Sequence, residues 1–265
     1  MNAQAALLEY GQRLLGEPLT PITWHPGHRG TVVLRASSAS HPQIIIKIHR
    51  GDVRHIQEVR AYQEWVPQLD GGAPQLVAVG DDPRGIAITT VPGIALADSN
   101  LSVTDEQRAH AAAGVLLANL HNAAPSIEDP QFPGWLAERG HHWLNRAGDR
   151  ITAAERRSAE CKLAELAAVP SPRLVPCHLD FTARNLIRDD DGTIRLIDFE
   201  HSRYDLPARD LVRLATRVWP QRLDLEAAFL STYGALTKGE RHLIECCESI
   251  DHASGLGTDA AMMTR

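Results

Sequence analysis

The chain has 265 residues, 43% hydrophobic and 23% charged, an ordinary composition for a soluble globular protein of one large or two small domains. Its formal charge of −6 argues against nucleic acid as the main partner, because phosphate contacts need a surplus of Lys and Arg. No apolar run approaches the ~20 residues of a membrane span, and the N-terminus lacks the basic start and apolar block of a signal peptide.

The cysteines, the histidines and the distribution of charge indicate the cellular compartment, the absence of a zinc site and the charge of the substrate. Four cysteines without a CxxC spacing favour a reduced, cytoplasmic protein. The thirteen histidines include no HxxxH or HExxH pair, so no zinc site is expected. Residues 1–95 hold equal numbers of basic and acidic groups, so the whole negative charge lies in the remainder. An acidic second half suits a cationic substrate, although in most acidic domains the charge serves only solubility.

The N-terminal third is predicted to form one helix and a sheet. Residues 2–15 have leucines spaced for one helical face, and Gly16 is a stop signal. Five short β-rich runs follow, separated by turn residues, at 22–25, 31–35, 43–49, 76–79 and 86–91. A second helix is expected over 53–65. The segment 91–93, Val-Pro-Gly, breaks the last strand and predicts a hinge, with one domain over 1–93 and another over 94–265.

Beyond the hinge the pattern is helical. Capping boxes at 104–107, 152–155 and 237–240 predict three helix starts, and 209–218 and 224–236 are two further helical candidates. The expected strand pair of this half is a hairpin, 185–188 with 193–197, joined by Asp-Asp-Asp-Gly, because Asp-Gly supplies the positive φ of a tight turn.

Oxygen-bearing side chains stand at both ends of this hairpin. Asp180 and Asn185 precede the first strand, and Asp198 follows the second. Folding the hairpin brings its ends together, and oxygen ligands of this kind suit Mg²⁺, which completes its shell with phosphates and water. The alternative is a surface hairpin with solvated acids.

A lone Lys47 interrupts the apolar run Ile44–Ile48. A Lys in a central strand is costly unless it is paired or faces a polar cleft, whereas on an edge strand it points outward. Glu58 is the first candidate for its ion-pair partner. Because only 11 residues separate Lys47 from Glu58, Glu64 is a second candidate. If paired, Lys47 is a fixed cation that reaches phosphate oxygens. The loop 27–30, Gly-His-Arg-Gly, offers main-chain N–H groups to phosphates in the same region, as a weak signal.

The order of these features resembles the protein-kinase-like fold, and within it the aminoglycoside phosphotransferase and choline kinase family. The segment 178–185, HLDFTARN, is similar to that family's catalytic loop, and 197–200, IDFE, to its second metal motif. Within 204–211, Asp210 stands where a family Asp braces the catalytic loop. The resemblance implies an α+β, bilobal fold. A small five-stranded antiparallel lobe with one helix (1–93) would bind nucleotide, and a larger, mainly helical lobe (94–265) would contain the catalytic hairpin and bind the acceptor.

The resemblance also implies roles for the residues around the hairpin. Asp180 would be the catalytic base that orients an acceptor hydroxyl and takes its proton, with His178 as a scaffold of the loop. Asn185 and Asp198 would hold Mg²⁺ against the phosphates of ATP.

In the sheet, the resemblance implies nucleotide contacts. Lys47, fixed by Glu58, would contact the α- and β-phosphates. Adenine would bond main-chain groups near Thr89 and Val91. The cofactors expected are therefore ATP and Mg²⁺.

The sequence also departs from the family pattern. Leu179 stands where Gly is common, and Thr182 where serine/threonine kinases have Lys, leaving Arg184 either to supply the missing charge or to anchor the loop. Glu200 replaces the Gly of protein kinases, which argues against a protein substrate and offers a second carboxylate near the metal.

The predicted function is an ATP-dependent O-phosphotransferase acting on a hydroxyl of a small polar or cationic molecule, first of all an aminoglycoside-like or other basic antibiotic. A kinase of choline, another amino alcohol, a sugar or homoserine is the alternative, as is a silent nucleotide-binding protein of the same fold. The expected partner is this small-molecule acceptor, with no nucleic acid and no membrane, on a cytoplasmic monomer or weak dimer.

Overall fold

The computed structural model describes residues 3–26 and 32–263, so the expected phosphate-binding loop 27–30 lies outside the described residues. The chain folds into two compact units, Met1–Asp105 with Ala183–Arg203, and Glu106–Thr182 with Tyr204–Arg265. The domain boundary after residue 93 stays a prediction. The hairpin, assigned by resemblance to the helical lobe, is part of the first unit, together with the sheet.

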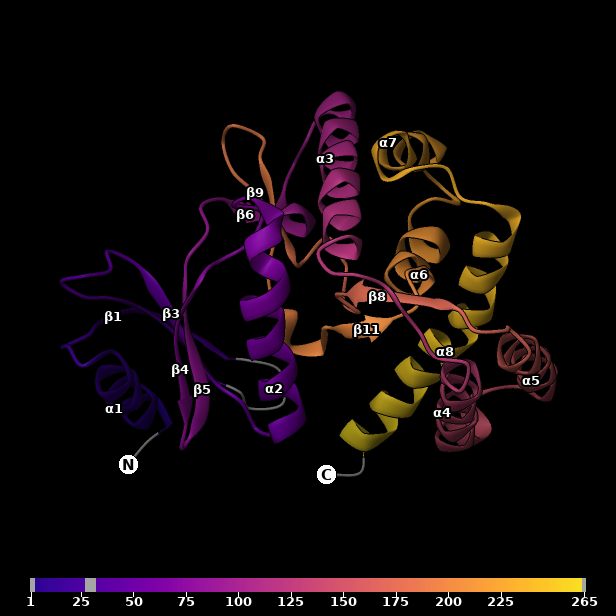
Figure 1. Cartoon of the computed structure of the whole chain (residues 1–265), viewed down its shortest axis with the longest axis horizontal. Helices are drawn as coiled ribbons and strands as arrows, with labels where there is room; N and C mark the ends of the chain where they lie inside the picture. Colours follow the sequence, from indigo (N-terminus) through magenta and orange to yellow (C-terminus); the bar gives the residue numbers. More distant parts are fainter. Residues whose placement is uncertain (1–2, 27–31, 264–265) are drawn as a thin grey trace. The chain divides into compact units, whose positions relative to one another are not determined.

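Within the described residues, the first unit contains the predicted five-stranded antiparallel sheet (Figure 1). Its strand order is β1-β2-β3-β5-β4. Its strands are β1 (Thr20–Pro26), β2 (Val32–Ser37), β3 (Ile44–Ile48), β4 (Leu76–Asp81) and β5 (Arg84–Thr89). β3 is central, paired with β2 on one side and β5 on the other. Lys47 is therefore on a central strand, and the edge-strand alternative is wrong.

One face of this sheet is closed by α1 (Ala3–Leu15), which ends at Gly16 with a φ of 68°. Ile44 and Ile46 of β3 are buried in a core with Leu7 and Tyr10 of α1. Because side chains alternate along a strand, Lys47 projects from the opposite face.

A helical segment follows β3 and carries Glu58. It begins as α2 (Asp52–Arg60) and continues as a π-helical turn over Ala61–Trp65 and a 3₁₀ turn over Val66–Leu69. The predicted helix 53–65 is thus present, with a change of pitch at Ala61. Trp65 is fully buried and anchors this change of pitch in the core.

The predicted hairpin forms from β9 (Leu186–Arg188) and β10 (Ile194–Leu196). Asp189 organises its turn, since its carboxylate accepts from the Thr193 N–H at 2.8 Å and Gly192 adopts a φ of 85°. β9 also pairs with β6 (Ile94–Ala95), directly after the hinge. The hinge contains Gly93, whose φ is 111° and whose backbone lies so close to the carbonyl of Arg188 that a Cβ would be 2.1 Å from its oxygen.

The second unit is mainly helical in its described part. Its helices are α3 (Val103–His121), α4 (Phe132–Ala147), α5 (Ala153–Ala167), α6 (Ala208–Arg217), α7 (Leu223–Tyr233) and α8 (Lys238–Met263), with α3 starting at the end of the first unit. α4, α5 and α6 all pack on α8, and Figure 1 shows α4 and α5 beside it.

Two of the three predicted capping boxes are present, at Thr152 and Thr237. The box at Thr104 is wrong, because Ser102, one residue before the helix, caps α3 by accepting from the Asp105 N–H at 3.2 Å. The expectation that the hairpin is the only strand pair beyond the hinge is also wrong. β7 (Ile127–Glu128), β8 (Arg173–Cys177) and β11 (Arg203–Asp205) form a small sheet. Among the described residues, no helix combines the length and apolar character needed to cross a bilayer.

Candidate active site

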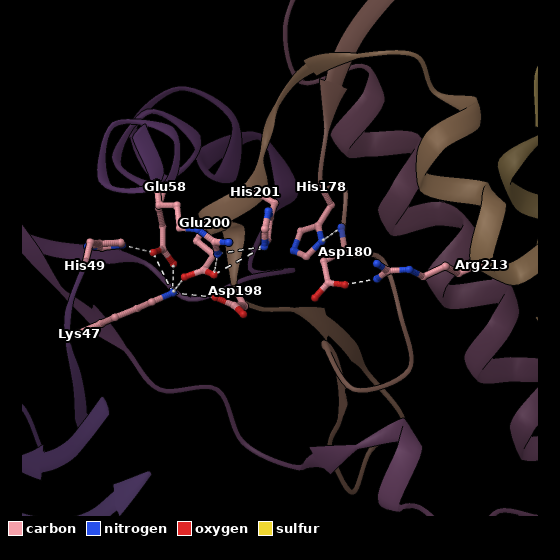
Figure 2. Close-up of polar contacts among 10 residues, drawn as sticks. Lys47, His49, Glu58, His178, Asp180, Asp198, Glu200, His201 and Arg213 are labelled. Carbon is pink, nitrogen blue, oxygen red and sulfur yellow. Dashed lines mark hydrogen bonds and ion pairs between the residues drawn. The ribbon is translucent and has the colours of Figure 1, made fainter. Parts of the chain in front are cut away.

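Lys47 is itself buried and is the centre of a charge cluster in the first unit (Figure 2). Its Nζ lies 3.0 Å from Glu58 Oε2, 2.7 Å from Asp198 Oδ1 and 3.0 Å from Glu200 Oε2. Burial alone would lower the pKa of Lys47, but the charges of the three carboxylates outweigh it and raise that pKa. Lys47 is therefore a permanent cation, held from three sides.

Glu58 is the partner that the sequence predicted. It is almost completely buried, and its carboxylate also meets Nε2 of His49. Glu64, the second candidate, instead pairs with Arg60 one turn away, at 2.9 Å on the surface of the helix. The pair of Lys47 and Glu58 therefore fixes the cation against α2.

The hairpin brings its two ends together, as the sequence predicted. The N–H of Ile197 donates to the carbonyl oxygen of Asn185 at 3.0 Å, so Asn185 and Asp198 come from adjoining positions. Asp198 adopts a left-handed conformation with φ 68° and ψ 66° at the start of the 3₁₀ turn Phe199–His201. Such a strained backbone is characteristic of residues whose side-chain direction matters for function.

A cavity of about 450 Å³ lies within the first unit. Six predicted site residues line it, namely Lys47, Glu58, Thr89, Val91, Asn185 and Asp198. Its other lining residues include Ile45, Ile88 and Ile187. A volume of several hundred Å³, apolar walls and a few convergent polar groups are typical of a small-ligand site. The oxygen atoms of Asn185 and Asp198 fit a hard divalent cation such as Mg²⁺.

Thr89 is one of the two residues expected near adenine, and its main-chain N–H is already engaged. The N–H of Thr89 donates to the carbonyl oxygen of Gln75 at 2.9 Å, and its hydroxyl accepts from the Gln75 N–H at 2.9 Å. The N–H of Thr89 is therefore not available to a ligand. The role of Thr89 and Val91 stays a prediction.

In the second unit, Asp210 braces the loop that carries Asp180. Its carboxylate accepts from the N–H groups of His178 at 2.8 Å and Leu179 at 2.5 Å. Burial would raise the pKa of Asp210, but hydrogen bonding and charge from His121 and the contacts to His178 lower it. The brace is the one that the resemblance implied.

Asp180 itself is tied to α6. One of its oxygens meets NH1 of Arg213 (Figure 2), and Arg213 Nε donates to Asp251 Oδ1 of α8 at 3.1 Å. The Asp180 N–H also donates to Nδ1 of His178 at 3.3 Å, so the His178 ring supports the loop. Arg213, itself anchored to Asp251 of α8, thus holds the side chain of Asp180.

The model of the phosphotransferase enzyme family matches residues 24–244 of the chain. The chain belongs to this family. Its membership confirms the predicted resemblance and the predicted class, a small-molecule phosphotransferase. No curated protein sequence matches the chain.

Solved structures of the same fold belong to enzymes with different acceptors in their names. A macrolide 2'-phosphotransferase, MphH from Brachybacterium faecium, is 20% identical with a TM-score of 0.69, covering 98% of this chain and 93% of that one. Spectinomycin phosphotransferase APH(9)-Ia with ADP and spectinomycin is 16% identical, with a TM-score of 0.67 and coverages of 97% and 87%. The choline kinase LicA from Streptococcus pneumoniae is 15% identical, with a TM-score of 0.64 and coverages of 97% and 91%. These likenesses confirm the protein-kinase-like fold.

Three contributors to the site were missed or only partly foreseen. His49 lies two residues after Lys47 on the same strand face, so the period of the strand could have indicated it. Arg213 follows Asp210 by three residues, one helical turn, which places both on one face of α6. Glu200 was expected near the metal, and the structure gives it a direct contact with Lys47.

Proposed function

We propose that this phosphotransferase moves the γ-phosphate of ATP to a hydroxyl of a small molecule. The observation that supports it most directly is the cavity of the first unit, where Lys47 is fixed by Glu58 and lies with Asn185 and Asp198 in one lining. A fixed cation and two oxygen ligands are what phosphoryl transfer requires for positioning and neutralising phosphates.

Within this proposal, Lys47 binds the α- and β-phosphate oxygens, and Glu58 keeps its ammonium in place. Asn185 and Asp198 are the residues that would hold Mg²⁺, which when bound neutralises charge on the phosphates. Because Lys47 now contacts Asp198 and Glu200 as well, phosphate binding exchanges one or both of these ion pairs for phosphate contacts.

Asp180 acts on the acceptor. The acceptor oxygen forms a bond to the γ-phosphorus, the bond from that phosphorus to the β,γ-bridging oxygen breaks, and ADP leaves. The hydroxyl proton passes to the carboxylate of Asp180, a contribution of ~10²–10⁴-fold for a positioned base.

For the acceptor we propose a basic or polar antibiotic before choline. An aromatic cage for a quaternary ammonium needs free ring faces. Trp135 and Trp143 of α4 each have a guanidinium over the ring, from Arg139 and Arg146, and Trp219 is 3% exposed. A cation thus already occupies one face of the Trp135 and Trp143 rings, with Trp135 41% exposed, and Trp219 is buried, which favours a polyhydroxylated acceptor over a choline-like one.

The test is ATP consumption with Mg²⁺ and a panel of aminoglycosides, macrolides, spectinomycin, choline and homoserine. Native protein is compared with Asp180→Ala and with Asp190→Asn, which removes an exposed acid from the same hairpin. We expect one acceptor class to be phosphorylated by native protein and Asp190→Asn, and Asp180→Ala to bind nucleotide without transfer. Nucleotide binding with no transfer to any acceptor supports a silent binding protein, and full activity of Asp180→Ala contradicts the mechanism.

A further inference from the structure

A second cluster of potential ligands lies on the outer helices of the second unit, and the proposed reaction does not use it. His242 and Cys246 are one turn apart on α8, and Glu165 reaches them from α5. Glu165 Oε2 is 3.2 Å from His242 Nε2 and 3.9 Å from Cys246 Sγ, and the sulfur is 3.7 Å from the same imidazole nitrogen. Three different ligand types therefore converge on one point.

These separations match the edges of a tetrahedral metal site. With bonds of about 2.1 Å to nitrogen or oxygen and about 2.3 Å to sulfur, tetrahedral geometry separates the ligand atoms by about 3.4–3.6 Å. Each observed separation differs from its ideal value by no more than ~0.3 Å. A metal ion at the centre thus requires only small side-chain adjustments.

The surroundings leave one side of the cluster open. Cys246 is fully buried, whereas the side chains of Glu165 and His242 are 47% and 48% exposed. A thiol at the floor and two ligands at the rim leave a fourth position toward solvent, which water can fill. Sulfur, imidazole and carboxylate together favour Zn²⁺ or a similar transition metal over Mg²⁺ or Ca²⁺.

The neighbouring charges are compatible with a bound cation. Lys162 lies 3.6 Å from Glu165 but nearer to Glu245, at 3.2 Å, so it keeps a partner when Glu165 turns to a metal. Glu245 is also 3.9 Å from His242 Nδ1, the nitrogen that a metal-bound imidazole commonly directs toward a carboxylate.

Two other clusters of possible metal ligands occur among the described residues, and the side chains of both are already engaged elsewhere. Glu58, Asp198 and Glu200 surround Lys47 and belong to the nucleotide site of the proposed reaction. In the buried cluster of His121, Cys177 and Asp210, the imidazole nitrogens contact Tyr233 and Asp210, and both carboxylate oxygens accept from N–H groups of the catalytic loop.

We propose that His242, Cys246 and Glu165 bind one transition-metal ion of the zinc class and so clamp α5 to α8. In the structure the thiol of Cys246 donates to Glu165, so binding exchanges this proton for the metal and releases it to solvent. The expectation of no zinc site rested on histidine pairs alone, and His-x-x-x-Cys supplies the same helical spacing with a sulfur ligand.

Co²⁺ titration of the full chain tests this, with excess Mg²⁺ to occupy other oxygen sites and a non-thiol reductant to keep cysteines reduced. We expect one Co²⁺ per chain, with tetrahedral visible bands and a near-ultraviolet thiolate-to-cobalt band, both displaced by Zn²⁺. Cys246→Ser abolishes the thiolate band, whereas Cys161→Ser, which removes an exposed thiol one turn before Glu165 on α5, leaves it unchanged.

His242→Gln and Glu165→Gln each remove one ligand from the exposed edge of the site, where a substitution disturbs folding least. Each should weaken Co²⁺ binding at least tenfold while leaving the circular dichroism spectrum and the melting temperature without metal unchanged. Zn²⁺ should raise the melting temperature of native protein and of Cys161→Ser, but not of Cys246→Ser. Absence of a thiolate band in native protein, or a band that survives in Cys246→Ser, overturns the proposal.

Discussion

Asp210 Oδ1 accepts a hydrogen bond from the N–H of Leu179 at 2.5 Å, and Leu179 adopts a φ of 63°. This left-handed conformation costs a residue with a Cβ about 1–2 kcal/mol, and glycine adopts it freely. Leu179 therefore holds this backbone at an energetic cost that glycine would not have. The two bonds to Asp210, from His178 and Leu179, offset that cost and orient the loop that carries Asp180.

Leu179→Gly should therefore fold with a free energy of unfolding within about 1 kcal/mol of native protein, because relief of strain offsets the added freedom of the unfolded chain. Leu179→Val should be less stable than native protein by about 1–2 kcal/mol, because a β-branched side chain fits a positive φ worst. Urea unfolding of both variants checks this. Equal stability of the two variants would show that the backbone is not strained.

Lys47→Met should lose transfer activity by at least ~100-fold, the scale of removing one preorganised charge from an active site. It should also lose about 3–5 kcal/mol of stability, because Glu58 is left buried without its main cation. In Lys47→Met/Glu58→Gln part of the stability should return and the activity should not. Recovery of both in the double variant would contradict a role for Lys47 in phosphate binding.

Arg213→Ala should lower kcat by up to ~100-fold with little change in the KM for ATP, because a misplaced base costs about that much. Arg213→Lys should recover part of kcat, since an ammonium still reaches one carboxylate. Arg217→Ala is the matched control: Arg217 also contacts Asp251, but its side chain is 61% exposed. An equal loss of kcat in Arg217→Ala would assign the effect to Asp251 and not to the contact with Asp180.

The stability of the fold should fall as the pH drops from 7.5 to 5.5. Burial lowers the pKa of His55 and of His110, so each is neutral in the folded state at a pH where the unfolded chain binds a proton. The unfolded state then holds more protons, so stability is lost below the ordinary histidine pKa of ~6.5, by at most ~1.4 kcal/mol per pH unit for each group.

Urea unfolding at the two pH values measures this slope. His55→Asn and His110→Asn should each flatten it, and His141→Asn, at an exposed position of α4, should leave it unchanged. Identical slopes in all variants would place the pH sensitivity elsewhere.

Gly93→Ala should destabilise the first unit by at least ~2 kcal/mol more than Gly71→Ala. Both glycines have a positive φ, and its strain alone is worth about 1–2 kcal/mol. Only at Gly93 would the added Cβ also collide with the main chain of Arg188, whereas nothing lies within 4 Å of it at Gly71. Melting temperatures of the two variants give the comparison, and similar values would show that the hinge can move away from β9.

The local parts of the site were predictable because their causes are local. The Asp-Gly turn, the alternation of β3 and the spacing between Asp180, Asn185 and Asp198 act over a few residues of chain. They determine the hairpin, its adjoining ends and the side of β3 from which Lys47 projects. The predicted start of α3 was wrong because Ser102 and Thr104 are both good N-cap residues. Local sequence does not decide between them, and packing determines which one caps the helix.

Tertiary structure alone determined the long-range polar partners of the site residues. Lys47 meets Asp198 across 151 residues of sequence, Asp180 meets Arg213 across 33, and Glu165 meets Cys246 across 81. No turn or helical period relates positions so far apart. Only the packing of whole elements, driven by burial of their apolar faces, brings such side chains within bonding distance, so only the folded chain shows which charges each one meets.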